Sequence, residues 1–347
     1  MNAAPELTRV RDAHRFDEAA LAAYLAEHLP GFRGALTVRQ FEGGQSNPTF
    51  LLAAAGREYV MRKKPPGRLL RSAHQVEREY RVMTALARSD VPVPRTHLLC
   101  EDASVVGTPF YVMQRVEGRV VSDPSLPDSS REQRRALYDH FARVPAALHH
   151  VDPVAVGLGH FGKPGDYCAR QISRWSRQYE ESKTEDIPEM EALIAWLPTH
   201  LPASDETCIV HGDYRIGNCI LHLEQPRVAA LIDWELSTLG HPLADLAYCC
   251  QVYRGGATPG QTLSGFDLAD LGIPSEGEFV ARYCELTGRP GIESWNFYMV
   301  FVMFRSAAIV QGVYKRGLDG NASSEHAREF GALVRLRAQN AWDLARS

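Results

Sequence analysis

Two short apolar runs constrain the fold most, because each one ends in a polar motif. The run at 207–210 precedes the segment HGDYRIGN at 211–218, and the run at 227–232 precedes the segment DWE at 233–235. Short apolar runs of this kind, bounded by turn residues, are typical of buried strands. A suitable fold must therefore deliver polar side chains at the carboxyl ends of two buried strands.

The spacing within these motifs indicates their chemistry. Asp213 and Asn218 lie five positions apart, and Asp233 follows 15 residues after Asn218. In kinases this spacing belongs to an Asp that accepts the proton of the substrate hydroxyl, and to an Asn and a second Asp that hold Mg²⁺. Mg²⁺ prefers a few protein oxygens together with phosphate oxygens and water. We therefore predict three catalytic residues: Asp213 as the base, and Asn218 and Asp233 as metal ligands.

Other histidines suggest metal sites, but we interpret them differently. His211 and Asp213 could form the metal pair of a hydrolase, yet no further His or Asp follows at ligand spacing. We interpret His211 as a hydrogen-bonding scaffold residue. His149 and His150 end a predicted helix, where a cation suits the helix dipole.

The periodicity changes along the chain. The first part predicts a helix at 18–28 capped by Asp17, strands at 49–53 and 58–62, a helix at 73–88, and strands at 97–100 and 109–116. From residue 130 helical spacing dominates, with a long helix at 131–150 that Pro145 should bend or interrupt, and a buried helix at 297–314. We predict an α+β fold with two lobes: residues 1–115 with an antiparallel sheet, and residues 116–347 that are mainly helical.

The composition excludes several classes of protein. The chain has 347 residues and a formal net charge of −4, so it carries no polybasic surface for nucleic acid or membrane. The segment 297–314 is interrupted by Arg305 and Gln311 and is too short and polar to span a bilayer. The seven cysteines form no C-x-x-C pair, and residues 1–15 show no secretory signal. We expect a cytoplasmic protein.

Six phrases in the right order carry a family resemblance: FEGGQSNPTFLL, YVMRKKPPG, VEREYRVMTAL, YVMQRVEG, HGDYRIGNCIL and LIDWELSTLGHPLADLAY. Over residues 41–248 the chain resembles the aminoglycoside phosphotransferase and choline kinase superfamily. It is most similar to the phosphotransferase module fused to some acyl-CoA dehydrogenases. The resemblance implies a protein-kinase-like fold and an ATP- and Mg²⁺-dependent kinase that phosphorylates a hydroxyl group of a small molecule.

The resemblance also implies roles for residues outside the two motifs. Asp245 is implied to brace the catalytic loop. Three groups of nucleotide-binding residues are implied. The loop that covers the phosphates contains Gly43, Gly44 and Ser46, and the phosphate-binding cation is Arg62 with Glu79 as its carboxylate partner. The hinge that meets adenine contains Met113, Arg115 and Val116.

Arg62 stands where the family usually has Lys. Arginine binds phosphate in a bidentate way, so the exchange is compatible with function without being neutral. Lys64 lies on the same strand face by period 2 and is the alternative phosphate-binding residue. The exchange also leaves a nucleotide-binding pseudokinase open as a second function.

The acceptor is not fixed by these motifs. Arg170, Arg174 and Arg177 recur at helical spacing and form either a solvated face or an anion-binding stripe for the substrate. We expect a hydroxyacyl-CoA or another anionic hydroxylated metabolite rather than a polycationic aminoglycoside. An acyl-CoA dehydrogenase is the least favoured function, because the kinase-like pattern extends over residues 1–347 and the sequence offers no separate flavin domain. The oligomeric state is not predicted.

Overall fold

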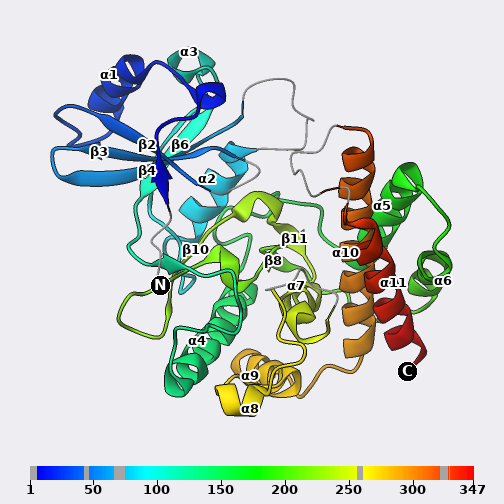
Figure 1. Cartoon of the computed structure of the whole chain (residues 1–347). Helices are drawn as coiled ribbons and strands as arrows, with labels where there is room; N and C mark the ends of the chain where they lie inside the picture. Colours follow the sequence, from blue (N-terminus) through cyan, green and yellow to red (C-terminus); the bar gives the residue numbers. More distant parts are fainter. Residues whose placement is uncertain (1–5, 43–46, 66–74, 256–260, 321–326, 328) are drawn as a thin grey trace. The chain divides into compact units, whose positions relative to one another are not determined.

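The computed structural model describes residues 6–42, 47–65, 75–255, 261–320, 327 and 329–347 (Figure 1). It divides into a first unit, Met1–Val121 with Asn218–Ser237, and a second unit, Ser122–Gly217 with Thr238–Ser347. The boundary predicted at residue 115 places 218–237 in the second lobe. The structure assigns this segment to the first unit, because its strands pair with the end of the first segment.

The first unit is built on an antiparallel sheet. Its six strands follow the order β1 (Leu7–Thr8), β2 (Thr37–Phe41), β3 (Thr49–Ala54), β4 (Arg57–Lys63), β6 (Phe110–Gln114) and β5 (Thr96–Cys100). Ala55 and Gly56 join β3 to β4 with φ angles of 48° and 74°, the left-handed conformation that a two-residue hairpin turn requires. The hairpin predicted from the sequence is confirmed.

Helices α1 (Glu18–His28) and α2 (Val76–Leu86) complete the first unit, with the short η1 (Asp12–His14) and α3 (Ala103–Val106). Asp17 caps α1 by accepting a hydrogen bond from the amide of Ala20 at 2.9 Å. Leu21 and Leu25 of α1 are fully buried in a core with Phe50 and Met61. Both predicted helices are present over the described residues.

A second, three-stranded sheet carries the metal-ligand candidates. It consists of β7 (Arg119–Val120), β9 (Cys219–Leu221) and β10 (Val228–Leu231), and β9 lies between the other two and pairs antiparallel with each. Gly118 lets β7 approach closely, since a Cβ there would lie 2.5 Å from the carbonyl oxygen of Leu221. The 3-10 turn η4 (Trp234–Leu236) follows β10.

The second unit is mainly helical. Its helices are α4 (Arg131–His150), α5 (Tyr167–Ser182), α6 (Pro188–Trp196), α7 (Pro242–Cys250), α8 (Leu268–Leu271), α9 (Glu276–Thr287), α10 (Trp295–Leu318) and α11 (Gly331–Arg346). Strands β8 (Cys208–Val210) and β11 (Thr238–Gly240) form an antiparallel pair, and η2 (Leu197–Thr199) and η5 (Gln251–Tyr253) are short turns. The predicted α+β class, with a sheet-based unit and a helical unit, is confirmed.

Helix α10 is the centre of the second unit. It packs against α5, α7 and α11 (Figure 1). By length and composition it could cross a membrane, but 78% of its most apolar window is buried inside the structure. Arg305 and Gln311 are buried within it. These features fit the core helix that the sequence indicated.

Helix α4 runs without a break through Pro145, so the predicted interruption is absent. Its start is fixed by a capping box. The side chain of Ser130 accepts from the amide of Gln133 at 3.2 Å, and the amide of Ser130 donates to the side chain of Gln133 at 2.8 Å. The amides of Ser130 and Gln133 would otherwise have no partner within the helix, and the capping box supplies one for each.

We predict that Ser130→Ala lowers the free energy of unfolding by about 1 kcal/mol, the usual cost of losing an N-cap. Denaturant unfolding followed by circular dichroism measures the change. Ser173→Ala, on the exposed face of α5, is the matched control and should cost nothing. Equal losses in the two variants would contradict the role of the cap.

Candidate active site

Arg62 lies at the centre of a buried charged cluster in the first unit. Its guanidinium Nη1 is 3.3 Å from Oε2 of Glu79, and its Nη2 donates to Oδ1 of Asp233 at 2.7 Å. Glu235 lies 3.9 Å from the same nitrogen. Burial disfavours the charge of Arg62, but Glu79 and Asp233 outweigh it and raise the pKa of Arg62. Three carboxylates therefore surround one guanidinium.

Glu79 of α2 is fully buried and bound from several sides. Its carboxylate accepts hydrogen bonds from Nδ2 of Asn47 at 2.8 Å and from the hydroxyl of Tyr111 at 3.1 Å. Burial raises the pKa of Glu79 to about 7, while the neighbouring Arg62 acts in the opposite direction. A Glu on a helix is usually exposed to solvent. The burial of Glu79 therefore shows that this face of α2 packs against the charged cluster.

The β9–β10 hairpin brings Asn218 and Asp233 together. The amide of Ile232 donates to the carbonyl oxygen of Asn218 at 2.9 Å, so the two ligand candidates lie at the same end of the hairpin. Asp233 has a φ of 67°, a conformation that a non-glycine residue adopts only where its surroundings impose it. The indole of Trp234, which is fully buried, anchors the turn by donating to Leu231 at 3.0 Å.

The donors of this cluster fit a divalent cation. An amide and a carboxylate at one hairpin end supply the short oxygen list that Mg²⁺ takes when phosphate and water complete its shell. The surplus of carboxylates over the Arg62 guanidinium also favours an added positive charge. Buried Nε of Arg62 has no hydrogen-bond partner among the described residues, which leaves a donor for an anion.

Lys64 does not join the Arg62 cluster. Its ammonium pairs with Glu77 at 2.8 Å, and the ammonium of Lys63 donates to the carbonyl oxygen of Val106 at 2.9 Å. Arg62 is thus the cation that meets Glu79 and Asp233 in the described part of the first unit.

The remaining predicted nucleotide residues are located less fully. Gly43, Gly44 and Ser46 lie outside the described residues. Met113 is buried in β6 opposite Val60 of β4. Arg115 and Val116 follow at the end of this strand, and the guanidinium of Arg115 pairs with Glu58. Their contacts with adenine stay predictions.

In the second unit, Asp245 holds the backbone of the catalytic loop. Its two carboxylate oxygens accept from the amides of His211 and Gly212, each at 2.8 Å. His149 lies 3.3 Å from the same carboxylate and contacts the hydroxyl of Tyr283 through its other nitrogen at 2.7 Å. Burial alone would raise the pKa of Asp245, but the contacts with His149 and the amide of His211 hold it below its ordinary value. The predicted bracing role is confirmed.

Asp213 follows directly in this loop. Its Oδ1 accepts a hydrogen bond from the hydroxyl of Tyr248, and its Oδ2 lies 3.5 Å from Nε of Arg215. Nδ1 of His211 contacts the amide of Asp213 at 3.3 Å, in keeping with its interpretation as a scaffold residue. The side chain of Asp213 is 18% exposed, so the carboxylate is ordered yet reachable.

An arginine from α10 supports the same region. Nη2 of Arg305 donates to the carbonyl oxygen of Gly212 at 3.2 Å. Its guanidinium carbon lies 5.5 Å from the ring centre of Tyr248 and 5.8 Å from that of Trp175. Such distances allow cation–π attraction to both rings. The loop is therefore held by α7 through Asp245 and by α10 through Arg305.

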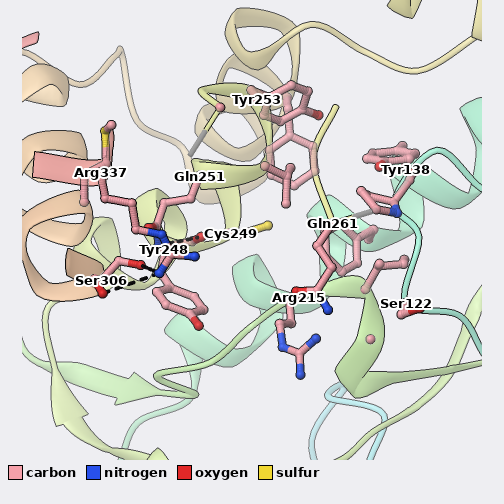
Figure 2. A pocket seen from close by; sticks show the side chains of 18 residues that line it. Ser122, Tyr138, Arg215, Tyr248, Cys249, Gln251, Tyr253, Gln261, Ser306 and Arg337 are labelled. Carbon is pink, nitrogen blue, oxygen red and sulfur yellow. Dashed lines mark hydrogen bonds between the residues drawn. The ribbon is translucent and has the colours of Figure 1, made fainter. Parts of the chain in front are cut away.

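A cavity of about 150 Å³ lies within the second unit (Figure 2). Tyr248 and Arg215, which contact the carboxylate of Asp213, both line it. Arg337 of α11 also lines the cavity and donates to the hydroxyl of Ser306 at 2.7 Å. Most of the other lining groups are apolar or aromatic, including Tyr138, Phe141, Val252, Tyr253, Phe279 and Met303. None of its described lining residues is Asp or Glu.

The predicted arginine stripe lies elsewhere on α5. Arg170 donates to the carbonyl oxygen of Lys163 at 2.6 Å. Arg174 is exposed beside the ring of Trp175, 5.3 Å from its centre, and Arg177 is exposed. None of the three is among the described lining residues of the cavity, where Arg215 and Arg337 supply the positive charge.

Sequence reasoning did not find Asn47, Tyr248, Arg305 or Arg337. Asn47 lies in the phrase FEGGQSNPTFLL and Tyr248 in the phrase LIDWELSTLGHPLADLAY. Their place in the phrases that carry the family resemblance could have marked them as candidate site residues. Arg305 and Arg337 come from distant helices, and no local pattern links them to the loop.

Comparison with known proteins first defines the class. The structure superposes on a thermostable variant of aminoglycoside phosphotransferase APH(4)-Ia, solved with ADP and hygromycin B, with a TM-score of 0.60 and 18% identity, over 94% of this chain and 98% of that one. A Ralstonia eutropha protein assigned as an aminoglycoside phosphotransferase gives a TM-score of 0.89 and 50% identity, over 96% and 99% of the two chains. The fold is that of the kinase-like phosphotransferases.

The family follows from the sequence match. Residues 37–295 match the phosphotransferase enzyme family. The chain belongs to this family of phosphotransferase enzymes. The predicted resemblance is confirmed.

Longer proteins contain a segment similar to this chain. Acyl-CoA dehydrogenase family member 10 of Mus musculus is 47% identical over 346 residues, which cover 98% of this chain and 32% of the mouse protein. Acyl-CoA dehydrogenase family member 11 of Gallus gallus is 45% identical over 351 residues, which cover 99% of this chain and 45% of the chicken protein. The chain thus spans less than half the length of either relative, and the similarity concerns only that part of each.

We predict that Asp245→Ala lowers the free energy of unfolding by about 2–6 kcal/mol, because two buried backbone amides lose their acceptor, at about 1–3 kcal/mol each. Its folded pKa lies below the ordinary value of 3.8, so its contribution is present above about pH 4 and is lost as the pH falls through the folded value. Denaturant unfolding at pH 7 and at pH 3 measures both effects. Asp319→Ala, on an exposed pair with Lys315, is the control, and an equal effect at that position would refute the assignment.

Proposed function

We propose that the protein is an ATP- and Mg²⁺-dependent kinase that phosphorylates the hydroxyl of an anionic metabolite with an apolar chain, such as a hydroxyacyl-CoA, in the cytoplasm. The observation that carries the proposal is Asp213, a carboxylate fixed by Tyr248 beside a cavity with no described carboxylate of its own. The seven cysteines are all buried and form no disulfide bond, which fits a reducing compartment.

In the proposed reaction Asp213 accepts the proton of the acceptor hydroxyl. The acceptor oxygen forms a bond to the γ-phosphorus of ATP, and the bond from that phosphorus to the bridging oxygen breaks, so ADP leaves with the electron pair. Asp245 and Arg305 keep the loop backbone fixed, so that little reorganisation is needed at the moment of transfer.

On the nucleotide side, Asn218 and Asp233 would hold Mg²⁺, which when bound neutralises charge on the β- and γ-phosphates. Arg62, kept in place by Glu79, would bind the phosphates; Asn47 and Tyr111 orient Glu79. We assign the phosphate contact to Arg62 rather than Lys64 because Lys64 is paired with Glu77.

The acceptor class follows from the charge of the cavity. A polycationic aminoglycoside needs carboxylates around it, whereas the described lining offers two arginines, Arg215 and Arg337, on a largely apolar wall. Guanidinium groups suit carboxylate, thioester or phosphate oxygens through charge-assisted hydrogen bonds. An apolar chain would gain roughly 25 cal/mol per Å² of surface that it buries there.

The CoA moiety is far larger than a cavity of about 150 Å³ and would lie outside it. The arginine stripe of α5, Arg170, Arg174 and Arg177, is our proposal for its phosphates. Trp175 connects this stripe to the loop, because Arg174 and Arg305 both lie against its ring.

The function is tested by kinase assays with 4-hydroxyacyl-CoA and with kanamycin at equal concentration. We expect ADP formation and a mass gain of one phosphate with the acyl-CoA, and none when Asp213 is replaced by Asn, because the base is lost. Arg337→Gln should raise the acceptor KM roughly 10- to 100-fold, as expected for one charge-assisted hydrogen bond.

Arg335→Gln is the matched control, since Arg335 lies on the same helix, is exposed and pairs with Glu185. Turnover of kanamycin with no turnover of any acyl-CoA would overturn the acceptor assignment. A lowered ATP affinity in Arg337→Gln would place that residue on the nucleotide instead.

We also predict that Arg62→Ala raises the ATP KM by about 100-fold or more, because a buried bidentate phosphate donor is lost. Arg62→Lys should keep part of the affinity, and Lys64→Ala should leave the ATP KM unchanged. Steady-state kinetics and nucleotide titration measure these effects. A larger effect at Lys64 would exchange the two roles, and ATP binding without turnover in the wild type would favour a pseudokinase.

A further inference from the structure

The two oxygens of Asp213 have different neighbours. The hydroxyl of Tyr248 donates to Oδ1, whereas Oδ2 faces Nε of Arg215 at 3.5 Å, the outer limit of a hydrogen bond. A carboxylate held at one oxygen keeps a defined rotation about its Cβ–Cγ bond. The contact of Tyr248 therefore fixes the rotation of the Asp213 carboxylate at Oδ1.

Tyr248 is itself held on two sides. It lies three residues after Asp245 on α7, so one face of this helix supplies both the brace of the loop backbone and the contact with its carboxylate. On the other side, the guanidinium of Arg305 lies over the Tyr248 ring and donates to the carbonyl oxygen of Gly212. The phenol and the loop are thus fixed by the same two helices.

The phenol keeps its proton. Burial raises the pKa of Tyr248, and the neighbouring charge of Asp213 raises it further. The hydroxyl is therefore a donor at neutral pH. Tyr248 also lines the cavity (Figure 2), so it contacts both the base and the space proposed for the acceptor.

We propose that Tyr248 is a positioning residue for the catalytic base: its hydroxyl holds Oδ1 of Asp213 and so fixes the orientation of the carboxylate that receives the acceptor proton. This rests on the proposed kinase function. The acceptor O–H bond breaks as its oxygen bonds to the γ-phosphorus, the proton moves to the carboxylate of Asp213, and ADP leaves with the electrons of the bond broken between the γ-phosphorus and the bridging oxygen. The proton on the carboxylate then passes to water.

The test compares Tyr248→Phe with Tyr298→Phe. Tyr298 is also buried in the second unit, and its hydroxyl contacts His241 at 3.2 Å, away from the loop carboxylate. We expect Tyr248→Phe to lower kcat about 10- to 100-fold, as for a lost hydrogen bond to a charged group, with both KM values changed less than about threefold. Tyr298→Phe should leave kcat and both KM values unchanged. A raised acceptor KM with normal kcat would instead make Tyr248 a substrate contact and overturn the proposal.

A second measurement does not need turnover. Tyr248→Phe should lower Tm in the wild-type background and have little effect in Asp213→Ala, because the partner is then absent. Equal Tm losses in both backgrounds would show that the contact is not made and would overturn the proposal. Absence of turnover in the wild type, with the Tm coupling intact, would refute the proposed kinase function rather than the contact.

Discussion

The carboxylate of Asp245 is the interaction on which the catalytic loop depends. It is buried and accepts from two consecutive backbone amides, so it replaces the hydrogen bonds that the strand loses where β8 ends. Gly212 has a φ of 81° at this point, which lets both amides face one carboxylate. A buried charge is costly unless it is fully bound, and the loop backbone together with His149 supplies that binding. The position of Asp213 is a consequence of this arrangement.

The Arg62 cluster follows a different logic. Its carboxylates are not balanced by the guanidinium, so the cluster is electrostatically incomplete in the absence of a cation. Such a site tolerates the repulsion because Asn47 and Tyr111 donate to Glu79 and offset part of its burial. The excess of carboxylates in the Arg62 cluster therefore lowers stability while it favours binding of a cation. At Asp245 the same hydrogen bonds both stabilise the fold and hold the catalytic loop. This contrast fits a brace in one unit and a binding site in the other.

Local chemistry explains what the sequence could predict. The Asp17 cap, the Ala55-Gly56 turn and the motif spacing around Asp213 and Asn218 are all set by neighbouring residues. The structure contains the predicted cap and turn, and the roles of Asp213 and Asn218 stay predictions. Pro145 shows the limit: it lies inside a continuous α4, although proline removes a backbone donor from a helix and can interrupt it. Arg305 and Arg337 reach the loop region and its cavity from helices about a hundred residues away in the chain. The packing of α10 and α11 places Arg305 and Arg337 there. The periodicity of the sequence predicts the helices but not how they pack against the loop.

The first unit is discontinuous in the chain, and this affects how it can fold. Its β9–β10 hairpin, with Asp233, is made only after residues 122–217 of the second unit have left the ribosome. Until then β7 lacks its partner strand, and Arg62 lacks the Asp233 carboxylate. Pairing β7 with β9 closes a loop of the chain that contains residues 122–217. Such pairing is slow, because the chain loses conformational entropy before the contacts form. The first unit is therefore completed only late in synthesis, and a chain cut at residue 121 would lack both β9, the partner of β7, and Asp233, the partner of Arg62.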